Sequence, residues 1–160
     1  MKQKLYLDTI IPSAFYDTSK PIRQLITQKW FENDANDFDL YISAITLREI
    51  EKIKNQIKKD NIEKLIIDYN MNLLDFTAEA DKLAEEYIKK GAIPKTEPED
   101  AYHVAIAVVN NIESLASWNF SHIVSINPIR KIHEINRNLG YEIIEINSLE
   151  IFGGHKYGYL

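Results

Sequence analysis

The chain has 160 residues, of which 45% are hydrophobic, 11% aromatic and 27% charged, a composition typical of one folded domain. At this length a single core can stabilise the fold without disulfides or structural metals. The formal net charge is −5, from 19 Lys and Arg against 24 Asp and Glu, which argues against a broad basic surface for polyanions. It does not exclude an acidic metal site beside local basic patches. The absence of cysteine excludes thiolate catalysis and cysteine-based zinc sites.

The first half of the chain alternates predicted strands with predicted helices. An apolar strand over residues 4–7 ends on Asp8, and a short helix over 11–16 follows it. Pro21 suits the first turn of a helix, and apolar residues at helical spacing extend that helix toward a polar turn at 33–39. The next predicted elements are a strand over 40–42, helices over 43–57 and 61–69, and a strand over 71–76.

The same alternation continues to the end of the chain. A helix over 77–90 is followed by Gly91, which suits the position just after a helix end. Further predicted elements are a helix over 99–110, a strand over 115–118, a helix from Pro128 to near Gly140 and a strand over 142–146. This order predicts an α/β fold, a three-layer α/β/α sandwich with a mainly parallel central sheet.

No linker, repeat or low-complexity tract divides the chain, so we expect one domain over residues 1–154 and a C-terminal tail over 155–160. The N-terminal residues lack the apolar region of a signal peptide, and no apolar run approaches the roughly 20 residues that span a bilayer. We therefore expect a cytoplasmic protein with no membrane partner.

Residues with side-chain oxygens follow the predicted strands. Asp8 ends the first strand, Glu49 lies in the helix after the second strand, and Asn119 follows the strand over 115–118. Asp100 lies in the first turn of a helix rich in Ala and Val. Because ligands of parallel sheets bind beyond the carboxyl ends of the strands, we expect these four residues to converge.

Carboxylates packed together repel one another and stay ionised only beside a cation. Oxygen ligands suit Mg²⁺ or Mn²⁺, which lower the pKa of a bound water and stabilise charge on a phosphodiester. The cluster therefore indicates metal-assisted phosphodiester hydrolysis.

Each of these residues also has a purely structural interpretation. Asp8 can cap the following helix, and Glu49 and Glu99 stand at capping-box spacing from Thr46 and Thr96. Asp100 sits where the helix dipole favours an acid, and Asn119 suits a turn.

Histidines and hydroxyl groups offer further candidates. His103 lies one turn after Asp100 and is placed either to contact substrate and orient a carboxylate, or to pack beside Tyr102 and bond a backbone carbonyl. His122 and His133 are interpreted as surface or structural residues. No nucleophile elbow surrounds any serine, and no Gly-rich phosphate loop is present.

Five segments of the sequence together resemble the PIN-domain ribonucleases, including the VapC-type toxins of bacterial toxin–antitoxin pairs. The resemblance covers nearly the whole chain, to about Gly154. The segments are LYLDT at 5–9, ISAITLREI at 42–50, YIKKGAIP at 87–94, EDAYHVAIA at 99–107 and ASWNFSHI at 116–123.

The resemblance implies a PIN fold and a metal-dependent ribonuclease in which Asp8, Glu49 and Asp100 hold Mg²⁺ or Mn²⁺. Asn119 stands where the family often has an aspartate, so it would position water while adding no charge. Ser43 or Thr46 would bond the phosphate or fix Asp8. The resemblance further implies a type II toxin with a small antitoxin partner, and a homodimer.

Two segments are locally basic. Residues 48–64 contain one Arg and five Lys, and Arg130 and Lys131 lie in the helix after Pro128. They suit phosphates of RNA, although a solvated helix face explains them equally well. One other function stays open, a non-catalytic PIN-like module that binds RNA or protein. A phosphoryl-transfer α/β domain is disfavoured, because Asn119 and Phe120 follow the strand over 115–118 where such a domain needs a Lys or Thr.

Overall fold

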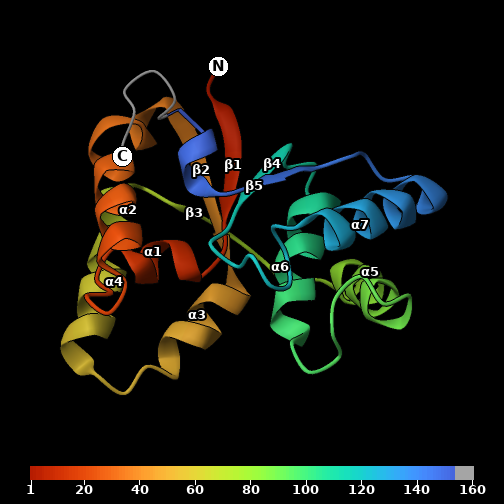
Figure 1. Cartoon of the computed structure of the whole chain (residues 1–160), viewed down its shortest axis with the longest axis horizontal. Coiled ribbons are helices and arrows are strands. Elements are labelled where there is room, and N and C mark those ends of the chain that lie inside the picture. Colours follow the sequence, from red (N-terminus) through yellow and green to blue (C-terminus); the bar gives the residue numbers. More distant parts are fainter. Residues whose placement is uncertain (154–160) are drawn as a thin grey trace.

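The protein is represented by a computed structural model, which describes residues 1–153 (Figure 1). Its centre is a five-stranded sheet in the order β3-β2-β1-β4-β5, and every neighbouring pair of strands is parallel. The predicted α/β fold with a parallel sheet is therefore confirmed. The strands are β1 (Gln3–Leu7), β2 (Phe38–Ser43), β3 (Asn72–Leu74), β4 (Ser114–Ala116) and β5 (Glu145–Asn147).

Helices cover both faces of this sheet, which gives the predicted three layers (Figure 1). Helices α1, α2 and α4 lie on one side, and α5, α6 and α7 lie on the other. The helices are α1 (Ile10–Ala14), α2 (Pro21–Asn33), α3 (Ala44–Glu51), α4 (Gln56–Asp68), α5 (Ala78–Lys89), α6 (Pro98–Val109) and α7 (Ile126–Leu139). Short 3-10 helices cover Ala35–Asp37 and Leu149–Ile151.

The central strand β1 contributes to two separate hydrophobic cores because successive side chains of a strand point to opposite faces. Tyr6 is buried in the core under α5, α6 and α7, whereas Leu5 and Leu7 are buried in the core under α1, α2 and α4. Helix α6 is buried along most of its length, which explains its Ala- and Val-rich sequence.

The predicted helix over residues 43–57 is wrong, because the chain leaves the helix after Glu51 and starts a new one at Gln56. Asn55 causes the restart: its side chain accepts a hydrogen bond from the Lys58 backbone N–H at 3.1 Å, as a helix N-cap does. The two helices therefore bury different residues, Ile50 in α3 and Ile62 with Leu65 in α4.

Two glycines stop helices at the predicted places. Gly91 and Gly140 have φ angles of +77° and +83°, a left-handed conformation that costs glycine little because it has no Cβ. Asn70 and Asn111 adopt positive φ angles just after α4 and α6. Among residues 1–153, no helix is long and apolar enough to cross a membrane. The expected boundary at residues 154 and 155, and the tail after it, lie outside the described residues.

Candidate metal and active site

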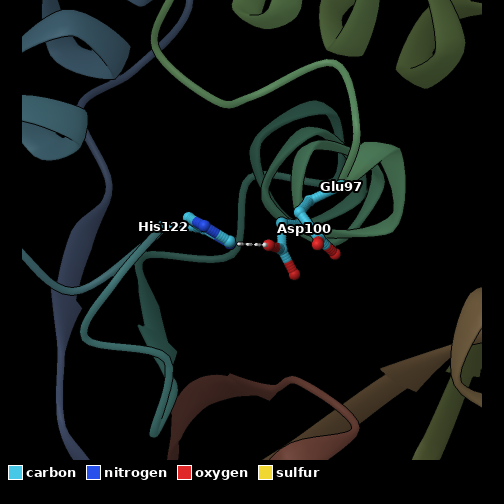
Figure 2. A group of neighbouring side chains, drawn as sticks. All are labelled: Glu97, Asp100 and His122. Atoms are coloured by element: carbon cyan, nitrogen blue, oxygen red, sulfur yellow. Dashed lines mark hydrogen bonds and ion pairs between the residues drawn. The ribbon is translucent and has the colours of Figure 1, made fainter.

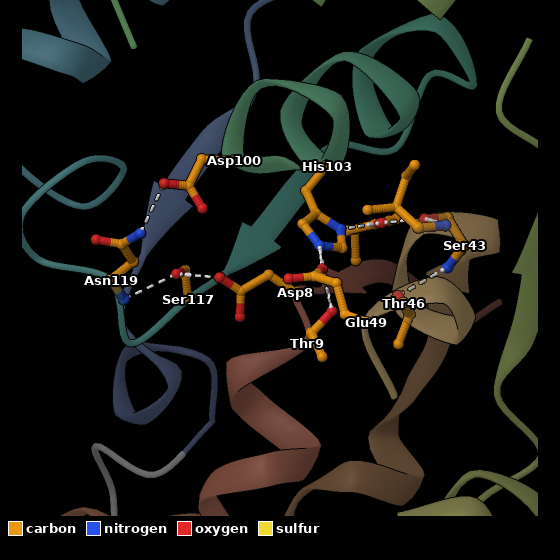
Figure 3. A network of polar contacts seen from close by, with 11 residues as sticks. Asp8, Thr9, Ser43, Thr46, Glu49, Asp100, His103, Ser117 and Asn119 are labelled. Carbon is orange, nitrogen blue, oxygen red and sulfur yellow. Dashed lines mark hydrogen bonds and ion pairs between the residues drawn. The ribbon is translucent and has the colours of Figure 1, made fainter. Parts of the chain in front are cut away.

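Asp8 lies at the carboxyl end of β1, in the middle of the sheet edge (Figure 3). It is 2% exposed, and its Oδ2 accepts a hydrogen bond from the hydroxyl of Ser117 just after β4. Its Oδ1 is buried and has no hydrogen-bond donor among residues 1–153. Burial raises the pKa of Asp8 to about 6, although His103 and Ser117 oppose the rise. Asp8 is not the cap of α1, because Thr9 holds that position and makes no side-chain cap.

Glu49 projects from α3 and is held by two donors. Its Oε1 accepts hydrogen bonds from the Thr9 hydroxyl at 2.7 Å and from His103 Nε2 at 2.6 Å. Burial acts to raise the pKa of Glu49, but the hydrogen bond and charge of His103, with the hydroxyl of Thr9, outweigh it and lower the pKa. The carboxylate is thus stabilised in its ionised form.

His103 orients that carboxylate, which is one of its two predicted functional roles. The residue is 2% exposed, and its Nδ1 lies 2.6 Å from the Tyr6 hydroxyl in a second hydrogen bond. The Tyr6 hydroxyl also donates to Ser43 Oγ at 2.8 Å. The buried chain of contacts from Ser43 to Glu49 therefore fixes the imidazole at both nitrogens (Figure 3).

Ser43 and Thr46 are fully buried and form a capping box at the start of α3. The Ser43 Oγ accepts from the Ile45 N–H, and Thr46 Oγ1 accepts from the Ser43 N–H at 3.2 Å. Both hydroxyls thus stabilise the helix that carries Glu49, and among residues 1–153 neither forms a hydrogen bond with Asp8. The capping box expected between Thr46 and Glu49 is wrong by one helical turn, because α3 begins directly at the end of β2.

Asp100 forms the other part of the site with residues from the loop after β4. Its Oδ2 accepts from Asn119 Nδ2 and from His122 Nδ1, each at 3.1 Å. Burial raises the pKa of Asp100, although His122 opposes the rise. Figure 2 shows Glu97, Asp100 and His122 gathered at the start of α6, with ligand atoms all within 4.8 Å of one another.

The expected capping box between Thr96 and Glu99 does not form, because Glu97 is the N-cap of α6 and makes no side-chain cap. Pro98 occupies the first helical turn, where a missing N–H is tolerated. The Asp100 side chain instead accepts hydrogen bonds from Asn119 and His122.

Asn119 is both a turn residue and a member of the site. Its backbone N–H donates to Ser117 Oγ at 2.9 Å, and its Oδ1 accepts from the His122 N–H at 2.9 Å. Because Ser117 also donates to Asp8, these contacts join Asp8 to Asp100 through one loop (Figure 3).

The site thus has two halves with Asp8 between them. We call the Tyr6–Glu49–His103 group the inner half and the Glu97–Asp100–His122 group the outer half. Within residues 1–153, the outer half is the only set of three acid or histidine side chains whose ligand atoms lie within 4.8 Å of one another. The predicted ligands Asp8, Glu49 and Asp100 do not form such a set among residues 1–153, but the charges of Asp100 and Glu49 both help to raise the pKa of Asp8.

The two basic residues singled out after Pro128 lie on α7, and neither forms an ion pair with the three carboxylates among residues 1–153. Arg130 is exposed, and Lys131 Nζ donates to the Gly91 carbonyl at 3.3 Å. Lys131 also lines a cavity of about 510 Å³ together with Lys89, Lys95 and His122. His122 therefore connects this cavity to the outer half of the site.

Sequence reasoning missed several residues of the site: Tyr6, Thr9, Glu97, Ser117 and His122. His122 was interpreted as a surface or structural residue, although it follows Asn119 by three positions in the same quoted segment. This position three residues after Asn119 is the only local feature that points to His122 as a site residue, since its partner Asp100 lies 22 residues earlier in the chain.

The family model of the PIN domain matches residues 5–119. The chain therefore belongs to the PIN domain family. No curated protein matches the sequence.

Two solved structures share the fold of this chain. One is VapBC2 from Rickettsia felis bound to a DNA fragment from their promoter: the TM-score is 0.54 at 17% identity, covering 89% of this chain and 98% of the other. The second is VapC20 from Mycobacterium tuberculosis, a Sarcin-Ricin loop cleaving toxin: the TM-score is 0.57 at 12% identity, covering 74% and 92%. The sheet and helix layers are thus those of VapC-type proteins.

Proposed function

We propose that this chain is a divalent-metal-dependent endoribonuclease. The observation that carries the proposal is the buried Asp8 carboxylate, whose Oδ1 has no donor among residues 1–153. A buried carboxylate oxygen without a donor is costly unless a cation or a proton compensates it. The neighbouring acids Glu49 and Asp100 make a cation the better match.

The donor set suits Mg²⁺ or Mn²⁺, because Asp8, Glu49 and Asp100 offer only oxygens. When bound, such an ion supplies Lewis acidity toward the phosphodiester and lowers the pKa of a coordinated water. The outer half adds Glu97 and the imidazole of His122, a nitrogen ligand that Mn²⁺ accepts more readily than Mg²⁺ does.

The residues around these carboxylates position them. Thr9 and His103 hold Glu49 ionised and in one orientation, and Ser117 holds one oxygen of Asp8 so that the other stays available. Asn119 holds Asp100 through a neutral amide. An acid at position 119 would repel Asp8, Glu49 and Asp100, and the amide avoids that repulsion. Its Oδ1 is occupied by the His122 N–H, so Asn119 acts as a positioning residue.

We extend the proposal to a cytoplasmic toxin of a type II toxin–antitoxin pair, with RNA as substrate, a small antitoxin as partner and a homodimer as its assembly. The support is the PIN family membership and the fold shared with VapC-type proteins. Expression of the chain alone should arrest growth, and Asp8→Ala should relieve the arrest. Growth arrest that persists with Asp8→Ala would contradict the toxin proposal.

RNA cleavage in the presence of Mn²⁺ or Mg²⁺ tests the enzyme proposal directly. Purified wild-type protein should cut single-stranded RNA only when the ion is present, and Asp8→Asn or Asp100→Asn should abolish cutting while circular dichroism stays unchanged. Asp39→Asn, an exposed carboxylate on β2, is the matched control and should cut normally. Cleavage by Asp8→Asn at the wild-type rate would overturn the proposal.

A non-catalytic PIN-like module that binds RNA or protein is the second candidate. One observation favours it: among residues 1–153, Asp8, Glu49 and Asp100 do not form one group within 4.8 Å. The resemblance to PIN-domain ribonucleases adds that Asn119 stands where the family often has an aspartate. Calorimetry separates the two candidates, since the module would bind neither Mn²⁺ nor Mg²⁺ whereas the enzyme binds at least one of them.

A further inference from the structure

An exposed aromatic and cationic surface lies beside Asn119. It consists of Arg23 at the start of α2 and of Trp118 and Phe120 in the loop after β4, and we call it the Arg23 platform. The guanidinium carbon of Arg23 lies 5.5 Å from the Trp118 ring centroid and 6.0 Å from that of Phe120. The two rings meet edge to face, with their centroids 6.1 Å apart.

Trp118 fixes the platform to the protein, whereas Phe120 is accessible to solvent. Trp118 is 5% exposed, and its indole N–H donates to Thr27 Oγ1 at 3.0 Å. The Thr27 hydroxyl donates in turn to the Arg23 carbonyl at 2.7 Å, which ties the platform to α2. Phe120, by contrast, is 49% exposed and belongs to neither hydrophobic core.

The charge of Arg23 is available for a ligand. Among residues 1–153, no carboxylate lies within ion-pair distance of its guanidinium, which rests only on the two aromatic rings. A hollow of about 420 Å³ lies over the platform, and its other lining residues include Lys20, Ile22 and Ile26. The hollow therefore combines positive charge with the exposed ring of Phe120 and the edge of the largely buried Trp118, and no acidic residue among residues 1–153 lines it.

The platform is continuous with the acidic site along the chain. Trp118 and Phe120 flank Asn119, whose amide contacts Asp100, and the residue before Trp118 is Ser117, which contacts Asp8. The two residues that contact the carboxylates, Ser117 and Asn119, thus alternate in sequence with the two rings of the platform.

We propose that the Arg23 platform stacks an unpaired nucleobase of single-stranded RNA, next to the phosphodiester held at the acidic site. The inference rests on the proposed ribonuclease function and adds a second contact to it. Aromatic rings and guanidinium planes stack on any base, and only an unpaired base presents a free face. The charge of Arg23, which has no carboxylate within ion-pair distance among residues 1–153, favours a phosphate chain over an apolar peptide, which would leave that charge unmatched.

Three variants separate stacking from charge and from apolar area. Phe120→Leu keeps an apolar side chain without a ring, Phe120→Tyr keeps the ring, and Arg23→Lys keeps the charge without the plane. Binding is measured by fluorescence anisotropy with a labelled single-stranded RNA of about twelve nucleotides, within the usual site size of single-strand binders. EDTA is present, so the readout is binding and not cleavage. Leu139→Ala, at an exposed apolar residue on α7, is the control.

We expect Phe120→Leu and Arg23→Lys to weaken binding about fivefold or more, the loss typical of one stacked base. Phe120→Tyr and Leu139→Ala should bind as the wild type does, and a duplex of the same sequence should bind more weakly than the single strand. Equal binding by Phe120→Leu and the wild type would overturn the platform. Phe120→Leu binding as well as Phe120→Tyr would also overturn it, because apolar area, such as a peptide partner needs, would then be sufficient.

Cleavage of the same RNA with Mn²⁺ keeps the two proposals distinguishable. Cleavage by the wild type, together with binding that is insensitive to Phe120→Leu and Arg23→Lys, would overturn the platform and leave the ribonuclease. RNA binding that is weakened by Phe120→Leu and Arg23→Lys, with no cleavage by the wild type, would overturn the ribonuclease proposal and leave the platform.

Discussion

The inner and outer halves of the acidic site each pair a carboxylate with an imidazole, but they hold the imidazole differently. His103 is fixed at both nitrogens, by Glu49 at 2.6 Å and Tyr6 at 2.6 Å, and its side chain is 3% exposed. His122 contacts Asp100 at 3.1 Å through Nδ1, and its side chain is 32% exposed. The inner imidazole is therefore part of the scaffold, whereas the outer imidazole faces solvent and the lysine-lined cavity. The carboxylates show the opposite order, because the Glu49 side chain is 31% exposed and that of Asp100 is 16% exposed.

The carboxyl groups of Glu49 and Asp100 also differ, in the direction of their pKa shifts. Burial acts to raise the pKa of both, but the short contacts of Glu49 with His103 and Thr9 lower its pKa overall, whereas the pKa of Asp100 stays raised. A cation that binds Asp100 therefore has to displace the weaker contacts of this carboxyl group with Asn119 and His122, whereas a cation that binds Glu49 meets a carboxylate that is already ionised and oriented.

The largest expected effect is on catalysis and is the same in both halves. Glu49→Gln and Asp100→Asn should each reduce metal-dependent RNA cleavage by more than about a hundredfold, beyond the loss typical of residues behind the metal ligands. Initial rates at saturating Mn²⁺ measure this. A variant that recovers the wild-type rate at high Mn²⁺ would mean that its carboxylate only strengthens ion binding.

The two histidines should differ strongly in their effect on stability. His103→Ala should lower the free energy of unfolding by about 2–4 kcal/mol, because it removes a buried partner of both Glu49 and Tyr6. His122→Ala should change it by less than about 0.5 kcal/mol, as exposed substitutions usually do. Urea denaturation of the two variants measures this difference. Equal losses in the free energy of unfolding would show that His103 and His122 do not differ in their structural role.

Asp8 should make the metal-free fold less stable at neutral pH than at acid pH. Its pKa rises through burial from the usual 3.8 to about 6, so the fold favours the protonated form. The resulting penalty is absent below the lower pKa, grows as the pH rises between the two values and is complete above about pH 6. Asp8→Asn lacks this penalty and should be more stable than the wild type at pH 7, by up to about 3 kcal/mol.

Thermal unfolding with EDTA at several pH values measures this difference. The gain of Asp8→Asn over the wild type should disappear near pH 4, and added Mn²⁺ should stabilise only the wild type. A gain that is independent of pH would show that ionisation of Asp8 is not its cause.

The smallest expected effect concerns the basic residues near the outer half. Lys131→Ala should weaken RNA binding a few-fold and reduce the salt dependence by about one phosphate contact. Lys64→Ala, whose ammonium is paired with Asp68 on α4, is the matched control and should bind normally. Equal losses in both variants would indicate general charge attraction and remove the preference for the outer half.

The parallel fold and the positions of the main acids follow from local sequence. Asp8, Glu49, Asp100 and Asn119 each come shortly after a predicted strand or at a predicted helix start, and the parallel sheet brings those points to one edge. Their partners could not be predicted in the same way. His122 reaches Asp100 and Tyr6 reaches His103 across 22 and 97 positions of sequence, and no local pattern encodes such pairs.

The break between α3 and α4 was missed for a different reason. Apolar residues at Ile50, Ile53 and Ile57 continue the helical spacing across the break, so periodicity alone favours one helix. The side chain of Asn55 ends that continuity by accepting a hydrogen bond from the Lys58 N–H at the start of α4. Caps therefore corrected two sequence predictions here, at Ser43 and at Asn55.

Isothermal titration of the protein with Mn²⁺ tests the central claim most directly, namely that Asp8 is a ligand of a divalent cation. The wild type and the Asp39→Asn control should bind the ion, and Asp8→Asn should lose that binding while its circular dichroism stays unchanged. Wild-type binding of Mn²⁺ by Asp8→Asn, or no binding by the wild type, would contradict the account.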